Sequence, residues 1–178
     1  HRSALFLSGL VLLFAIIFAR ARRTGNAGNY RFYSVKGPGH GPRDSLGKAQ
    51  KGAEGIMRLF ANKKVPMAIA SSSQTEIINA VLGKLSIQKY FKVAHSAEHE
   101  PYGKPHPGVY ITTAKKLNVE PEFCLAFEDS PNGVLSAKAA KMKCIAVPDS
   151  AMRDNKIFFI AYMVLGSLED FRLEYLPD

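Results

Sequence analysis

The feature that most constrains the fold is an alternation of short apolar runs with amphipathic segments from about residue 47 onward. Each apolar run has the length of a strand, and in the segments between them apolar residues recur at helical spacing. The expected strands cover 65–71, 91–96, 123–129, 142–149 and 161–166, and the expected helices cover 47–62, 74–85, 107–117 and 132–141. Strands that are apolar throughout are typical of a sheet buried on both faces. We therefore predict an α/β fold, a parallel sheet with helices on both faces.

The basic character of the chain comes mainly from its first 50 residues. Of the net charge of +9, residues 1–50 contribute eight Lys and Arg against one acidic residue, whereas residues 51–178 carry sixteen against fourteen. Because charge is nearly balanced over the expected core, the sequence does not favour nucleic acid as a partner. Cys124 and Cys144 both lie in apolar runs and are expected to be reduced core residues.

Residues 1–50, an apolar run followed by a basic linker, are expected to form a segment separate from the core at 51–178. Its apolar run starts at Ala4 and ends at Ala19, which is short of the roughly 20 residues that a spanning helix needs. Three interpretations stay open: a membrane anchor, a removable targeting segment, and a stretch produced by mistranslation. We expect a monomeric, cytoplasmic core, with membrane anchoring or organelle targeting if residues 1–23 are genuine.

Two expected strands lead into residues that suit phosphate. The run 65–71 leads into Ser71, Ser72 and Ser73, which precede a helix, so hydroxyls and backbone N–H groups would face an anion there; an ordinary helix cap is the alternative. Lys104 follows the run 91–96 and precedes a proline that stiffens its loop. It would place a positive charge over a phosphate, the alternative being a solvated loop lysine.

A third strand ends in two adjacent carboxylates, Glu128 and Asp129. Hard oxygen ligands at a strand end suit Mg²⁺, while a solvated pair that caps the next helix is the alternative. In parallel sheets the carboxyl ends of the strands share one edge, so serine, lysine and carboxylates would meet there. The combination indicates phosphoryl chemistry with a divalent metal. The histidines at 95, 99 and 106 are not spaced as ligands of one site and are expected at the surface or in loops.

Three stretches resemble the haloacid dehalogenase (HAD) superfamily: AIASSSQ, GKPHPGVYITTAKKLNV and CLAFEDSPNGVLSAKAAKMKCIAVP. They are most similar to the beta-phosphoglucomutase-like phosphatases, such as 2-deoxyglucose-6-phosphate phosphatase and the hexitol phosphatases, and cover roughly residues 51–172. The resemblance implies a Rossmann-like HAD core and a Mg²⁺-dependent phosphatase that acts on a small phosphorylated metabolite, a sugar phosphate of the hexose 6-phosphate type.

The resemblance also implies roles for individual residues. Ser71 would bind the transferring phosphoryl group with backbone amides near Ser72, and Ser73 would face the substrate. Lys104 would neutralise the phosphoryl group and orient the nucleophile. The metal would be held by Glu128 and Asp129, and Gly133 would permit close packing where the next helix begins.

One part of the family pattern is missing. The first motif, an Asp-x-Asp at the end of the first strand, supplies the nucleophile and the general acid/base, and no Asp-x-Asp occurs in this sequence. The helical cap that follows that motif is also not recognisable. We therefore expect a truncated core without its first strand and cap. The alternative function is a catalytically inactive phosphate-binding or interaction module, with or without a membrane anchor.

Overall fold

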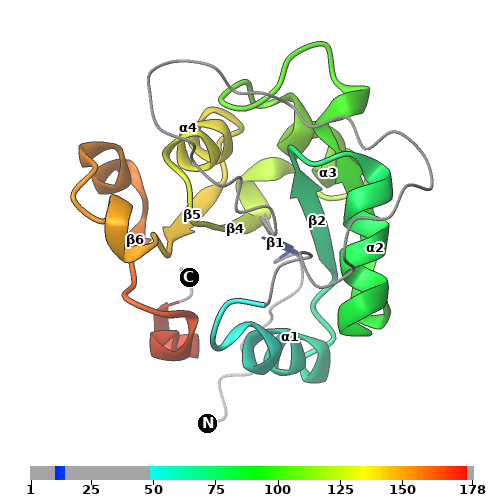
Figure 1. Cartoon of the computed structure of the whole chain (residues 1–178), viewed down its shortest axis with the longest axis horizontal. Coiled ribbons are helices and arrows are strands. Elements are labelled where there is room, and N and C mark those ends of the chain that lie inside the picture. Colours follow the sequence, from blue (N-terminus) through cyan, green and yellow to red (C-terminus); the bar gives the residue numbers. More distant parts are fainter. Residues whose placement is uncertain (1–10, 15–48, 176–178) are drawn as a thin grey trace, which may run out of the picture.

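The computed structural model describes residues 11–14 and 49–175. Within these residues, six parallel strands form one sheet in the order β3-β2-β1-β4-β5-β6 (Figure 1). The strands are β1 (Val11–Phe14), β2 (Met67–Ser71), β3 (Phe91–Ser96), β4 (Cys124–Glu128), β5 (Lys143–Ala146) and β6 (Met163–Val164). The predicted α/β class and the parallel sheet are confirmed.

Four α-helices in the described part of the chain connect these strands: α1 (Ala53–Asn62), α2 (Thr75–Leu85), α3 (Gly108–Leu117) and α4 (Pro131–Ala139). Both α2 and α3 end at a residue in the left-handed conformation, Ser86 and Asn118, which stops the helical hydrogen bonds. The helix expected from residue 47 begins only at Ala53, after Gly52 with a φ of 87°. A glycine is needed at position 52 because that backbone angle disfavours other residues.

The expectation that the sheet lacks its first strand is wrong, because β1 lies between β2 and β4. Leu12 pairs with Met67 on one side and with Leu125 on the other, both in parallel register. The buried backbone N–H and C=O groups of β2 and β4 need hydrogen-bond partners. The four apolar residues of β1 supply them as the strand in between. Residues 1–10 and 15–48, the rest of the expected N-terminal segment in place of the helical cap, lie outside the described residues.

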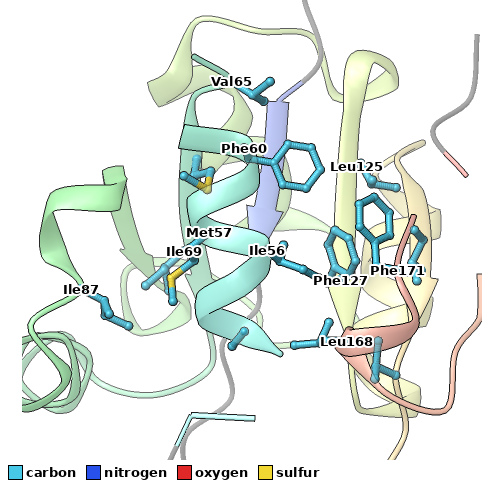
Figure 2. Packing of buried hydrophobic residues seen from close by; sticks show 14 of the residues in the cluster. Ile56, Met57, Phe60, Val65, Ile69, Ile87, Leu125, Phe127, Leu168 and Phe171 are labelled. Atoms are coloured by element: carbon cyan, nitrogen blue, oxygen red, sulfur yellow. The ribbon is translucent and has the colours of Figure 1, made fainter. Parts of the chain in front are cut away.

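The two faces of the sheet carry side chains of different size. On β4, Leu125 and Phe127 pack with α1, α2 and the C-terminal turn, whereas the smaller Cys124 and Ala126 pack with α3 and α4. Figure 2 shows the first of these two cores, where Phe171 packs edge-on against Phe127 with ring centroids 5.3 Å apart. Small residues on the other face let α3 and α4 approach the sheet closely. Because side chains alternate along a strand, Glu128 continues the row of Cys124 and Ala126 toward α3 and α4.

Among the described helices, none combines the length and the apolar character that crossing a bilayer requires. Both cysteines are free and buried, as expected. Burial raises the pKa of the Cys124 thiol to about 12, so this thiol is protonated at neutral pH.

Candidate active site

The strand order reverses between β1 and β4, and side chains from three connections meet at the carboxyl ends of the strands beside this point. Lys104, in the loop between β3 and α3, extends its ammonium group to the end of β2, where it donates to the carbonyl of Ala70 over 3.2 Å. The same ammonium reaches the end of β4 and lies 2.6 Å from Glu128 Oε1. Lys104 therefore links the end of β2, which leads into the serines, to the end of β4, which carries Glu128, as the sequence predicts.

The ion pair between Lys104 and Glu128 is withdrawn from solvent. The two side chains are 4% and 0% exposed. Tyr110 of α3 also donates its hydroxyl to Glu128 Oε1 and accepts from the Lys104 ammonium at 3.3 Å. The expectation that Lys104 might be merely a solvated loop lysine is thereby excluded. A buried charge pair needs such extra hydrogen bonds to offset the cost of removing two charges from water.

The second oxygen of Glu128 lies under the start of α4. Ser130 caps this helix by accepting from the backbone N–H of Gly133 at 3.0 Å, and its hydroxyl lies 3.4 Å from Glu128 Oε2. A Cβ atom at position 133 would overlap the Glu128 carboxylate, so only glycine leaves room for it. The expected role of Gly133 in close packing is thus explained by this carboxylate.

Asp129 differs from its neighbour because Oδ1 is buried and has no hydrogen-bond partner among the described residues. Burial, and secondly the charge of Glu128, raises the pKa of Asp129 to about 7. A buried carboxylate oxygen without a donor costs free energy unless a proton or a cation satisfies it. The donor set and this unpaired oxygen fit a hard divalent cation such as Mg²⁺.

Within the described part of the chain, no group of three or more His, Cys, Asp or Glu side chains could hold a metal. Glu128 already binds Lys104 and Tyr110, so Asp129 is the better placed of the two carboxylates. Mg²⁺ at this edge would complete its coordination with water and a phosphate ligand, as it commonly does.

The raised pKa of Asp129 predicts a stabilising effect of Asp129→Asn in the absence of metal. The folded protein retains a proton there that the unfolded chain releases near pH 4, so stability falls as pH rises from about 4 to about 7. At pH 8 without Mg²⁺, we expect the variant to be more stable than wild type by about 1–3 kcal/mol, and nearly equal at pH 4. Added Mg²⁺ should raise the melting temperature of wild type only. Equal shifts in both proteins would contradict metal binding at Asp129.

The serine loop after β2 is held by its own hydrogen bonds. Ser71 is buried, and its Oγ accepts from the backbone N–H of Ser73 at 3.1 Å. Ser96, at the end of β3, donates its hydroxyl to the carbonyl of Ser73 at 2.7 Å. Ser72 is exposed. These hydrogen bonds therefore fix Ser71 and Ser73 in the loop that follows Ala70, the residue that Lys104 contacts.

The carboxyl end of β1 is the place where the family pattern would put its nucleophile. Phe14, the last residue of β1, pairs with Ile69 and with Phe127, the residue before Glu128. The sequence continues after Phe14 with Ala-Ile-Ile-Phe-Ala, in which no side chain can act as a nucleophile or base.

His95 corrects one expectation, because it is buried rather than at the surface. It lies in β3 beneath α3, where Nε2 is 2.7 Å from Glu100 Oε1 and Nδ1 is 3.0 Å from Lys116 Nζ. Since lysine can only donate, Nδ1 accepts and Nε2 carries the proton that Glu100 accepts. Its burial follows from the position of β3 under α3, which the pattern FKVAHS does not reveal.

Sequence reasoning missed two residues that organise the site, Tyr110 and Ser96. The sequence places Tyr110 among the apolar positions of its helix, and only its contacts show that its hydroxyl joins the ion pair. Ser130 had a detectable signal, since Ser-Pro-Asn-Gly after a strand is a helix-start pattern.

Comparison with known proteins decides the family. Residues 42–147, more than half of the chain, match the haloacid dehalogenase-like hydrolase family. The chain belongs to this family. The HAD assignment and its beta-phosphoglucomutase-like group, both suggested by the sequence motifs, are confirmed.

Relatives and solved structures agree with this HAD assignment. Hexitol phosphatase B of Escherichia coli K12 is 36% identical over 119 residues, which are 67% of this chain and 54% of the relative. CbbY from Rhodobacter sphaeroides, bound to xylulose-(1,5)bisphosphate, superposes with a TM-score of 0.68 at 25% identity, covering 73% of this chain and 59% of CbbY. Beta-phosphoglucomutase from Clostridium difficile gives a TM-score of 0.62 at 28% identity, covering 71% and 54%. The chain thus spans little more than half the length of these HAD proteins.

Proposed function

We propose that residues 49–175 form the phosphate- and Mg²⁺-binding core of a phosphatase that hydrolyses a small sugar phosphate of the hexose 6-phosphate type. The observation that carries this proposal is the position of the Lys104 ammonium between the end of β2 and the end of β4, together with the unpaired oxygen of Asp129, the residue after Glu128. The similarity to a hexitol phosphatase supports the substrate class.

Each residue of the site has a defined task under this proposal. Lys104 offsets the negative charge of a phosphoryl group, and the loop of Ser71, Ser72 and Ser73 presents hydroxyl and backbone N–H groups at the start of α2. Asp129 holds Mg²⁺, with Glu128 fixing the lysine beside it. When bound, the metal supplies stabilisation of the charge on phosphate oxygens.

A second function, phosphate binding without turnover, is favoured by one observation. The sequence after β1 has neither carboxylate of the family's first motif, although β1 lies between β2 and β4 where that motif would begin. Without a nucleophile and a general acid/base, the chemical step loses its two main protein groups. The remaining site still has the charge and donors to bind a phosphorylated metabolite.

The test is to measure phosphate release and phosphate binding on the same purified full-length chain. Hexose and hexitol 6-phosphates are incubated with Mg²⁺ or with chelator while inorganic phosphate is assayed, and affinity for orthophosphate is measured by titration calorimetry. Lys104→Met and Asp129→Asn should each abolish any release. Lys143→Met, at the amino end of β5, serves as a control on the opposite edge of the sheet.

The possible outcomes separate the two functions. Release that requires Mg²⁺ and disappears in both site variants supports the phosphatase. Binding without release supports the inactive module, and absence of both contradicts both functions. Release that survives in both variants comes from a contaminating enzyme and counts against the phosphatase.

A further inference from the structure

Tyr110 is a fully buried polar residue at the site to which the proposed function assigns no task. It lies in the first turn of α3 with its ring against Lys104, whose ammonium is 4.7 Å from the ring centroid. Its hydroxyl contacts both charges of the ion pair, donating to Glu128 Oε1 and accepting from Lys104. A tyrosine needed only for packing would not require these polar contacts.

The hydrogen bonds of Lys104 show why the hydroxyl matters. An ammonium group has three N–H donors. In this structure it has three acceptors, which are Glu128 Oε1 at 2.6 Å, the Ala70 carbonyl at 3.2 Å and the Tyr110 hydroxyl at 3.3 Å. A phosphate oxygen must therefore replace one of them. The bond to Tyr110 is the one that exchanges at the lowest cost, because its acceptor is an uncharged hydroxyl that keeps Glu128 as a partner.

Tyr110 keeps a partner after this exchange. Burial and the charge of Glu128 raise the pKa of the Tyr110 hydroxyl well above its usual value, so it stays protonated and continues to donate to the carboxylate. Glu128 Oε1 thus always has a second donor besides Lys104. With part of the carboxylate charge offset by this donor, more of the lysine charge is available to a ligand.

We propose that Tyr110 is a positioning residue for phosphate, whose hydroxyl holds one Lys104 N–H in place until a phosphoryl oxygen accepts it. This inference rests on the proposed function, since it assumes that the ligand of Lys104 is a phosphate. Because the phenylalanine variant keeps the ring and loses only the hydroxyl, Tyr110→Phe separates this role from packing.

The first test compares the affinity for orthophosphate in the presence of Mg²⁺. Tyr110→Phe is expected to bind about tenfold more weakly than wild type, because Glu128 Oε1 loses the hydroxyl donor that it keeps in wild type and then holds the Lys104 ammonium more strongly. In a Lys104→Met background the same substitution should change the affinity by less than twofold, because there is no ammonium to position. Tyr162→Phe, which removes a half-exposed hydroxyl near the edge strand β6, should bind as wild type does.

A second test does not depend on phosphate. In ¹⁵N-lysine-labelled protein, the Lys104 ammonium protons should exchange with water at least tenfold faster in Tyr110→Phe than in wild type. An unchanged exchange rate, or an equal loss of phosphate affinity with and without Lys104, would overturn the proposal. If wild type binds no phosphate, the proposed function fails, while the exchange rate still decides whether Tyr110 positions Lys104.

Discussion

Lys104→Met should lower the free energy of unfolding by about 3–5 kcal/mol at pH 8, the usual effect of removing one partner of a buried ion pair. The reason is that Glu128, whose side chain has no exposed surface, would keep its negative charge with only hydroxyl donors nearby. Urea denaturation at pH 8 measures the loss.

The double variant Lys104→Met, Glu128→Gln is the control for this prediction. It removes both charges while keeping side chains of similar size, so most of the lost stability should return. If Lys104→Met alone costs less than about 1 kcal/mol, the pair behaves as an exposed ion pair and its burial in the structure is contradicted.

Gly133→Ala should be the most damaging small substitution in the core of the site, with a loss of about 3 kcal/mol or more in stability. The added Cβ would occupy the space of the Glu128 carboxylate, which Lys104 and Tyr110 hold from the other side. The carboxylate cannot move away without breaking those contacts. Thermal and urea denaturation of the purified variant measure the effect.

Two comparisons isolate the cause of this loss. Gly55→Ala, in α1 with open space around its Cβ position, should stabilise the protein by about 0.5–1 kcal/mol, since alanine favours a helix. In a Glu128→Ala background, Gly133→Ala should cost far less than in wild type. An equal cost in both backgrounds would mean that the glycine serves the backbone rather than the carboxylate.

The order of elements and the residues at the strand ends could be predicted from local pattern alone. The apolar runs at 65–71 and 123–129 correspond to β2 and β4, which are buried on both faces and have no polar alternation. The run 91–96 corresponds to β3, an edge strand with alternating exposure. Ser71, Lys104 and Glu128 could then be assigned to one edge, since parallel strands place their carboxyl ends together. Lys104, Glu128 and Asp129 are the residues that the structure brings together there.

The central strand could not be predicted, because its sequence fits two environments. Val-Leu-Leu-Phe is equally suitable for a lipid bilayer and for the middle of a sheet, and the surrounding apolar residues left a membrane anchor, a targeting segment and a mistranslated stretch as open interpretations. Only hydrogen bonds to β2 and β4, strands more than 50 residues away in sequence, make it β1.

The sequence by itself therefore determined the class of fold and the family, and it predicted Ser71, Lys104, Glu128 and Asp129 as residues of the site. The tertiary structure alone decided how the adjacent Glu128 and Asp129 divide their tasks, since one carboxylate is enclosed by Lys104 and Tyr110 while an oxygen of the other has no hydrogen-bond partner among the described residues. Adjacent residues on a strand point to opposite faces, and what each face contains depends on helices that lie far along the chain.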